Sequence, residues 1–340
     1  MTKLFENYPL TALNTFRLSA NSAYFSEIHS VNELLELLSD VQFTHLSKLV
    51  LGGGSNVLFT GDFDGLIILN KICGTSTVRE TDDLVFVHAG AGENWHQFVL
   101  KTISMGLGGL ENLSLIPGCV GAAPIQNIGA YGIEIKNTFH SLEAVSMEEG
   151  KLRTFSKDEC RFGYRDSIFK QEEKGKYIIT GVTFALSKKP LLHLDYGAIK
   201  QELTVKNIVH PTIQDVSNAV ISIRQSKLPD PKVIGNAGSF FKNPEVKNEK
   251  AEELRMQFPE IVSFPFTDTT SKLAAGWMIE KCGWKGKRIG NVGMHEKQAL
   301  VLVNYGGATG NELINHARMV QTSVNEKFGV TLEMEVNIIS

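Results

Sequence analysis

The stretch Lys48-Leu49-Val50-Leu51-Gly52-Gly53-Gly54-Ser55-Asn56 places a short apolar strand directly before three consecutive glycines. Glycine adopts backbone conformations that other residues avoid, and the main-chain N–H groups of such a loop can bind phosphate. The loop departs from the dinucleotide fingerprint, because its sixth place holds Val57 and the residues that follow predict a strand. No P-loop motif occurs in the chain. A phosphate cradle and an ordinary β-turn both fit this loop.

Residues 116–132 form a second segment that is rich in glycine and other small residues and has little periodicity. Long irregular stretches inside compact domains are usually functional. Small residues let the backbone approach a flat or extended ligand closely. Two such segments in one chain of mixed helices and strands suggest a large nucleotide cofactor that is held by main-chain groups.

The composition limits the classes of protein that need to be considered. A chain of 340 residues is long enough for two or three domains, and its formal net charge of −3 gives no basic surface for nucleic acid. Its four cysteines contain no C-x-x-C pair, so no zinc or other metal site is predicted. The N-terminus lacks the apolar core of a signal peptide, and no run of about 18 apolar residues occurs. We therefore expect a cytoplasmic protein without a membrane partner.

Periodicity predicts several helices and strands. Apolar spacing indicates helices at residues 31–38 and 94–104. Thr309 and Glu312 form a capping box before an apolar stripe that Gly329 closes. Residues 331–339 alternate and predict a strand, with Leu332, Met334, Val336 and Ile338 on one face.

Three sets of polar residues could carry chemistry. Ser239 lies within Asn236-Ala237-Gly238-Ser239-Phe240-Phe241-Lys242-Asn243-Pro244, where it is either a presented hydroxyl or a turn residue. Arg161 and Arg165 flank a glycine, and Asp166 could hold one of them in place; the alternative is a surface ion-pair cluster. Glu335 shares a strand face with Glu333, which is either a solvated edge or part of a site.

Taken together, these motifs resemble those of the MurB family, the UDP-N-acetylenolpyruvoylglucosamine reductases of peptidoglycan synthesis. The resemblance covers nearly the whole chain. The segments that carry it, in order, are residues 51–58, 90–95, 109–113, 116–121, 124–132, 160–167, 227–232 and 235–244. It implies an α+β fold of three domains, namely an FAD-binding fold of the vanillyl-alcohol oxidase/PCMH type and a C-terminal substrate-binding α+β domain. We expect FAD subdomains at residues 1–70 and 71–226 and a substrate domain at 227–340, whose last strand can pack back on the FAD domain.

The family's reaction supplies roles for the polar residues. NADPH reduces FAD, and the reduced flavin passes hydride to C3 of the enolpyruvyl group of UDP-N-acetylglucosamine enolpyruvate, which gives UDP-N-acetylmuramate. Arg165 and Glu335 match the residues that stabilise the enol-like intermediate, and such preorganised charge is a strong source of catalysis. Ser239 matches the residue that protonates C2.

The resemblance also implies binding residues. Leu194-Asp195-Tyr196-Gly197 is similar to the tyrosine-bearing loop of type I members. Substrate contacts are expected from Tyr196, Lys227, Asn243 and Gln298, with Arg224 as an addition. Cofactor contacts are expected from Gly52, Gly53, Gly54, Ser55, Asn56, Ile116, Pro117, Gly118, Gly121, Ala122, Ala123 and Ile128.

Some features depart from the family pattern or leave other functions open. Met334 stands where proline is common, Gly53 where glutamate is common, and Ala122-Ala123 where some relatives have hydroxyl residues. The chain is expected to act as a monomer. The alternatives are another FAD oxidoreductase of the same fold, which would not need Ser239, Arg165 and Glu335, and a protein that binds a UDP-sugar without catalysis.

Overall fold

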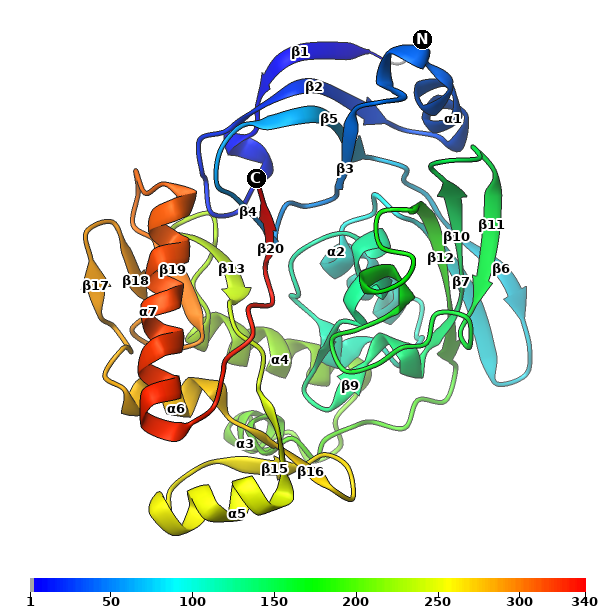
Figure 1. Ribbon diagram of the computed structural model, residues 1–340. Helices are drawn as coiled ribbons and strands as arrows, with labels where there is room; N and C mark the ends of the chain where they lie inside the picture. Colours follow the sequence, from blue (N-terminus) through cyan, green and yellow to red (C-terminus); the bar gives the residue numbers. More distant parts are fainter. Residues whose placement is uncertain (1–2) are drawn as a thin grey trace. The chain divides into compact units, whose positions relative to one another are not determined.

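The computed structural model describes residues 3–340, and the chain forms two compact units (Figure 1). The first unit contains the residues up to Tyr8 together with residues 22–53 and 64–226. The second contains residues 9–21, 54–63 and 227–340. One boundary lies between Gly53 and Gly54, inside the first glycine-rich loop. Another lies at residues 226 and 227, where we expect the substrate domain to begin; the division into three domains stays a prediction.

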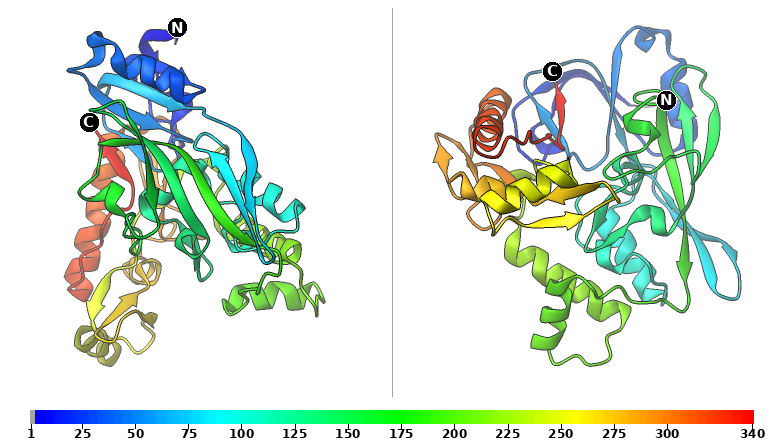
Figure 2. Two further views of the ribbon diagram at one scale, coloured as in Figure 1. Left: turned by 90° about the vertical axis from the view of Figure 1, so that its right-hand side faces the viewer. Right: turned by 60° about the horizontal axis from the view of Figure 1, so that its bottom comes forward.

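The first unit is built on two larger sheets and four helices. One sheet has the strand order β1-β2-β5-β3 and the other β11-β10-β12-β7-β6, and β8 and β9 form a small pair. The strands of the five-stranded sheet are the long green and cyan arrows of Figure 2. The strands are β1 (Leu4–Pro9), β2 (Asn21–Ile28), β3 (Ser47–Leu51), β5 (Phe63–Asn70), β6 (Thr75–Glu80), β7 (Leu84–Gly90), β8 (Gly129–Ala130), β9 (Ile133–Glu134), β10 (Phe139–Ser146), β11 (Leu152–Ser156) and β12 (Tyr177–Ser187). The helices are α1 (Val31–Ser39), α2 (Trp95–Ser104), α3 (Gly197–Val205) and α4 (Ile213–Lys227).

The two helices that apolar spacing predicts in this unit are confirmed as α1 and α2. Each begins at a side-chain cap: the Ser30 side chain accepts from the N–H of Glu33, and that of Asn94 accepts from the N–H of Gln97. Such caps satisfy donors that the first helical turn leaves without partners. Helix α2 packs on the five-stranded sheet, where the Trp95 ring lies 5.8 Å from that of Phe184 on β12.

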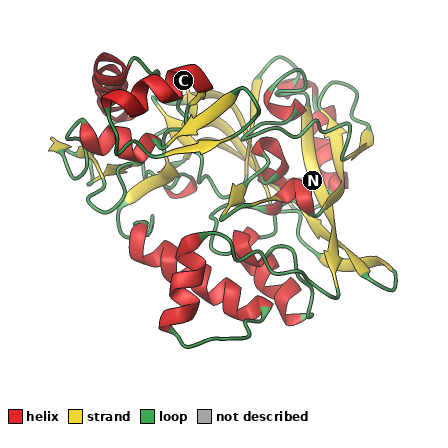
Figure 3. Ribbon diagram, turned by 90° about the horizontal axis from the view of Figure 1, so that it is seen from below, coloured by secondary structure: helices red, strands yellow, loops and turns green. Residues whose placement is uncertain are grey.

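The second unit has smaller sheets and three helices. Its sheet orders are β13-β19-β18-β17 and β14-β16-β15, and β20 pairs with β4. The strands are β4 (Val57–Phe59), β13 (Gly235–Ser239), β14 (Glu245–Lys247), β15 (Ser263–Pro265), β16 (Thr270–Leu273), β17 (Arg288–Ile289), β18 (Val292–Met294), β19 (Val301–Asn304) and β20 (Asn337–Ile339). The helices are α5 (Asn248–Gln257), α6 (Ala275–Lys281) and α7 (Gly310–Phe328). Helices and strands contribute to both units (Figure 3).

Helix α7 follows its sequence signals closely. The capping box of Thr309 and Glu312 is present, and Gly329 ends the helix in the left-handed conformation, with a φ of 62°. The expected apolar stripe is buried along its whole length, from Leu313 to Phe328. Burial of this stripe joins α7 to the core of the second unit.

The strand predicted at residues 331–339 is shorter in the structure. Only β20 (Asn337–Ile339) is a regular strand, and it pairs in parallel with β4. Leu332 and Val336 are buried as predicted, whereas Ile338 is 46% exposed, so its place on the apolar face was wrong. The alternation of buried and exposed side chains ends at Asn337, where the chain begins to pair with β4.

Within residues 3–340, none of the helices combines the length and the apolar character that crossing a membrane requires.

His316 is a buried polar group in the core of the second unit. It is 2% exposed, neither of its ring nitrogens has a hydrogen-bond partner among the described residues, and its ring meets that of Trp284 edge-on at 5.1 Å. Burial, together with the charge of Lys287, lowers the pKa of His316 from 6.5 to about 4. The native state therefore holds this imidazole neutral.

His316 should make the native state sensitive to acid. Because its pKa is lower in the folded than in the unfolded chain, its contribution is full above pH 6.5 and is lost as the pH falls towards about 4. Between about pH 7.5 and about pH 5, His316→Phe should gain about 2 kcal/mol of unfolding free energy relative to the wild type. Urea unfolding of both proteins at the two pH values measures this. Parallel pH profiles would show that His316 does not titrate on unfolding.

Candidate active site in two halves

The two glycine-rich segments of the first unit lie against each other. A Cβ added to Gly53 would lie 3.1 Å from the Cα of Gly118, and one added to Gly52 would lie 3.2 Å from the Cβ of Cys119. These separations are tighter than most side-chain contacts. The absence of side chains therefore allows Gly53 to approach the backbone of Gly118 and Gly52 to approach the side chain of Cys119.

Gly54, the first residue of the second unit in this loop, permits no side chain. Its φ is +59°, and an added Cβ would lie 1.8 Å from the carbonyl oxygen of Leu13. Its own carbonyl accepts the N–H of Thr15 at 3.0 Å. Gly54 is buried, and across the described chain the N–H groups of Gly54 and Ser55 donate to no other protein atom. These main-chain donors are suited to a phosphate oxygen.

The arginine motif at residues 160–167 is tied to the second glycine-rich segment by three hydrogen bonds. Arg165 Nη2 donates to the carbonyl of Gly129 at 2.8 Å. Asn127 Nδ2 donates to the carbonyl of Gly163 at 2.8 Å, and Ser167 Oγ donates to that of Ile125 at 2.7 Å. These bonds fix the half-buried guanidinium of Arg165 beside the expected cofactor segment, within the first unit.

Asp166 does not hold either arginine, contrary to the expectation from sequence. Its carboxylate accepts the amide of Gln171 and the N–H of Ser167. Arg161 pairs with Glu172 instead. The Lys170 ammonium donates to the carbonyl of Arg165 at 3.1 Å. The motif thus separates into an exposed ion pair at Arg161 and a braced turn at Arg165, whose φ is 53°.

A second polar group in the first unit surrounds Arg224. Its Nε donates to the carbonyl of Leu115 at 3.2 Å, and the N–H of Leu115 donates to Nδ1 of His96 at 3.0 Å. Burial lowers the pKa of Arg224, while the nearby Tyr131 hydroxyl raises it. Burial also lowers the pKa of His96, with a further contribution from the Arg224 charge, so the imidazole stays neutral. Arg224 also lies within electrostatic reach of Arg165, and this pair of cations suits an anionic ligand.

Ser239 is an exposed hydroxyl on a rigid base. Gly238 has a φ of 71°, and β13 is irregular between Asn236 and Ser239 where it pairs with β19. The next residue, Phe240, is completely buried, and its N–H donates to the carbonyl of Leu300 at 2.8 Å. The bulge turns the strand and the buried ring anchors it, so Ser239 is presented at a fixed place.

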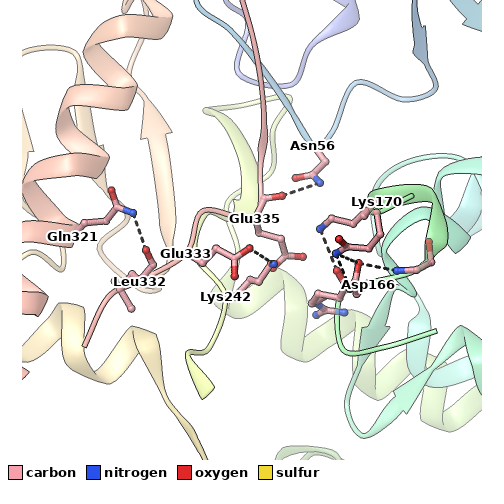
Figure 4. Close-up of polar contacts among 11 residues, drawn as sticks. Asn56, Asp166, Lys170, Lys242, Gln321, Leu332, Glu333 and Glu335 are labelled. Atoms are coloured by element: carbon pink, nitrogen blue, oxygen red, sulfur yellow. Dashed lines mark hydrogen bonds and ion pairs between the residues drawn. The ribbon is translucent and has the colours of Figure 1, made fainter. Parts of the chain in front are cut away.

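Within the second unit, hydrogen bonds link Glu335 to Phe240, the neighbour of Ser239, and to the side chain of Asn56. The N–H of Glu335 donates to the carbonyl of Phe240 at 2.8 Å. The carbonyl of Glu335 accepts Nδ2 of Asn56 at 3.3 Å, as Figure 4 shows. The Lys242 ammonium pairs with the carboxylate of Glu333, so the two glutamates have different surroundings. The structure thus bonds Glu335 to Asn56 and to the residue that follows Ser239.

Asn243 and Gln298 both lie beside the first turn of α6. The Oδ1 of Asn243 accepts the N–H of Ala275 at 3.0 Å, and the Oε1 of Gln298 lies where a Cβ on Gly276 would approach to 3.3 Å. Because its oxygen is engaged with the helix, Asn243 has its amide donor directed elsewhere. Two expected substrate contacts, far apart in sequence, are therefore neighbours.

The predicted site residues divide between the two units. Arg165, Tyr196, Gly52, Gly53 and those of residues 116–128 belong to the first unit. Gly54, Ser55, Asn56, Lys227, Ser239, Asn243, Gln298 and Glu335 belong to the second. Sequence reasoning did not single out Tyr131, His96 or Asn112. Tyr131 and Asn112 lie inside the quoted motifs and His96 directly follows one, but isolated polar residues of this kind show no periodicity that would mark them.

The residues of the glycine-rich loops fit the phosphates of FAD. In the second unit, Gly54 and Ser55 offer main-chain donors of the kind that bind phosphate; in the first unit, Gly53 and Gly118 lie close together without side chains between them. No lysine is needed in this arrangement, which agrees with the absence of a P-loop motif.

Comparison with known proteins finds two family models that match this chain. Residues 230–339 match the family model of the UDP-N-acetylenolpyruvoylglucosamine reductase C-terminal domain, and residues 22–156 match that of an FAD binding domain. UDP-N-acetylenolpyruvoylglucosamine reductase of Flavobacterium johnsoniae is 51% identical over 98% of both chains. The enzyme of the same name from Burkholderia lata is 50% identical over 98% of this chain and 96% of its own.

The chain belongs to the UDP-N-acetylenolpyruvoylglucosamine reductase (MurB) family. A crystal structure of MurB from Thermus caldophilus shares the fold, with a TM-score of 0.67 and 22% identity over 100% of this chain and 99% of that one. The predicted α+β FAD-binding fold is therefore confirmed. As a MurB family member, the protein is a flavin-dependent oxidoreductase.

Replacing Gly54 should damage both the fold and the retention of flavin. In Gly54→Ala, the left-handed φ and the overlap with Leu13 should together cost about 2–4 kcal/mol of unfolding free energy. The measurements are urea unfolding and the molar ratio of flavin to purified protein, which should fall. Gly61→Ala is the matched control, since an added Cβ there meets nothing within 4 Å. Equal behaviour of the two variants would contradict this role of Gly54.

Proposed function

We propose that the protein reduces UDP-N-acetylglucosamine enolpyruvate to UDP-N-acetylmuramate, with NADPH as reductant and FAD as cofactor, in the synthesis of peptidoglycan precursors. Family membership supports the reaction. The single structural observation that carries the proposal is the hydroxyl of Ser239, presented between a left-handed glycine and a buried phenylalanine whose carbonyl accepts the N–H of Glu335.

The proposed roles follow from the electronic demands of the substrate. Bound FAD supplies hydride transfer from NADPH to the C3 methylene carbon. An enol ether is electron-rich, so it accepts hydride only if the charge that develops on its carboxylate is stabilised. Arg165 and Glu335 serve this purpose as preorganised groups. Ser239 then gives its proton to C2, and because a hydroxyl is a weak acid, its fixed position matters more than its free acidity.

The remaining residues are proposed to hold the substrate and the cofactor. Tyr196, Lys227, Asn243 and Gln298 contact the UDP-sugar, and the position of both Asn243 and Gln298 beside the first turn of α6 supports a shared ligand for those two amides. The loops at residues 52–56 and 116–128 hold FAD. The reaction uses soluble nucleotides, so we place the protein in the cytoplasm, acting as a monomer.

Substitution of Ser239 should separate the two half-reactions. Ser239→Ala should keep flavin reduction by NADPH within about twofold of the wild type, because that step requires no proton at C2. Reoxidation by UDP-N-acetylglucosamine enolpyruvate should slow by about 10²–10⁴, the usual contribution of a positioned acid. Anaerobic stopped-flow spectroscopy measures both rates.

Ser104→Ala, at the exposed end of α2, is the control and should leave both rates unchanged. Equal loss of both half-reactions in Ser239→Ala would show that Ser239 supports the structure and does not donate the proton.

A further inference from the structure

Tyr196 lies at the end of a segment that has little support of its own. The tyrosine is 51% exposed and precedes α3, and no side chain caps that helix. Residues 191–195 form no helix or strand. Leu194 packs against the small apolar cluster of α3 and α4. A side chain that acts on a ligand from such a segment needs an anchor elsewhere.

Asn112 supplies that anchor. Its Nδ2 donates to the carbonyl of His193 at 3.0 Å, three residues before Tyr196. Throughout residues 3–340, this is the one hydrogen bond that reaches residues 191–194. Asn112 is 1% exposed, so the donor end of this bond is shielded from competing water.

The same amide group holds a second tyrosine-bearing segment. Asn112 Nδ2 also donates its second hydrogen to the carbonyl of Tyr131 at 3.1 Å. Tyr131 has a φ of 50°, a conformation that is unusual for an aromatic residue, and its ring meets that of Tyr196 edge-on with centroids 5.1 Å apart. The Tyr131 hydroxyl lies close enough to the charge of Arg224 for that charge to lower the pKa of the tyrosine, against the larger effect of burial. The buried side chain of Asn112 therefore fixes the backbone at Tyr131 and at His193, in the segment that leads to Tyr196.

Asn112 is itself held firmly in the short helical turn Glu111–Leu113. The carboxylate of Glu111 accepts the N–H of Gly109 at 2.6 Å, and the Trp95 indole donates to the carbonyl of Leu113 at 2.9 Å. Leu113 is completely buried. The turn is thus a rigid base for the more exposed segment that follows β12.

We propose that Asn112 is a positioning residue that holds Tyr196 in place for the UDP-sugar, acting through the carbonyls of Tyr131 and His193. The inference rests on the proposed function, because Tyr196 matters only if it contacts substrate. Asn112 itself touches neither substrate nor cofactor in this account.

Asn112→Leu tests this, since leucine has a similar size and cannot donate. In the holoprotein, cleavage by chymotrypsin within residues 191–196 should become about tenfold faster. The KM for UDP-N-acetylglucosamine enolpyruvate should rise by about five- to tenfold, the effect expected for losing such a bond. Flavin reduction by NADPH should remain within about twofold. In a Tyr196→Ala background, Asn112→Leu should raise the KM by less than about twofold, because the residue that it positions is gone.

Asn70→Leu is the matched control in the same unit. Asn70 is 5% exposed, and its Nδ2 donates to the carbonyl of Ile179 at 2.9 Å, so the variant also loses a buried amide. It should alter neither cleavage at 191–196 nor the KM. If Asn112→Leu does not fold, Asn112→Asp keeps the shape, places an acceptor against both carbonyls, and should give the same changes.

A variant that lowers only thermal stability, or one that raises the KM equally with and without Tyr196, would overturn the proposal. Failure of the proposed function is distinct: the wild-type protein would then not reduce the enolpyruvyl substrate at all. The cleavage assay is independent of that activity, and unchanged cleavage in Asn112→Leu would show that Asn112 does not hold the segment.

Discussion

Two main-chain hydrogen bonds near the end of the chain constrain the catalytic half in the second unit. The N–H of Glu335 donates to the carbonyl of Phe240, and the N–H of Asn337 donates to that of Asn56 at 3.1 Å. Because main-chain bonds of this kind have narrow geometry, they set the spacing of the three segments without relying on flexible side chains. Glu335, Ser239 and the end of the glycine-rich loop therefore share one framework, and the proposed proton donor depends on it.

The glycines at residues 52–54 matter because they have no side chains. Gly53 meets Gly118 as backbone within the first unit, and Gly54 meets Leu13 within the second. A methyl group at either place would have to displace main chain, which cannot move as a side chain can. The loop thus combines close packing with main-chain donors for phosphate.

Local signals in the sequence predicted the helices well, because caps and apolar stripes act over one or two turns. The capping box at Thr309 and the helix end at Gly329 are confirmed. The sequence could not show that Asn112 links Tyr131 to His193. Asn112 and His193 are 81 residues apart, and their hydrogen bond depends on tertiary folding. Two predictions from the sequence were wrong. The alternating pattern placed Ile338 on the buried face, but it is exposed. The neighbouring arginines suggested an ion pair for Asp166, but its carboxylate accepts from Gln171 and Ser167.

The most direct test of the account is an anaerobic titration of the wild-type protein after reduction by one equivalent of NADPH. Addition of UDP-N-acetylglucosamine enolpyruvate should restore the absorbance of oxidised flavin, with one UDP-N-acetylmuramate formed for each flavin reoxidised. Flavin that stays reduced after the substrate is added, or that is reoxidised without formation of the lactyl ether, would contradict the proposed reaction.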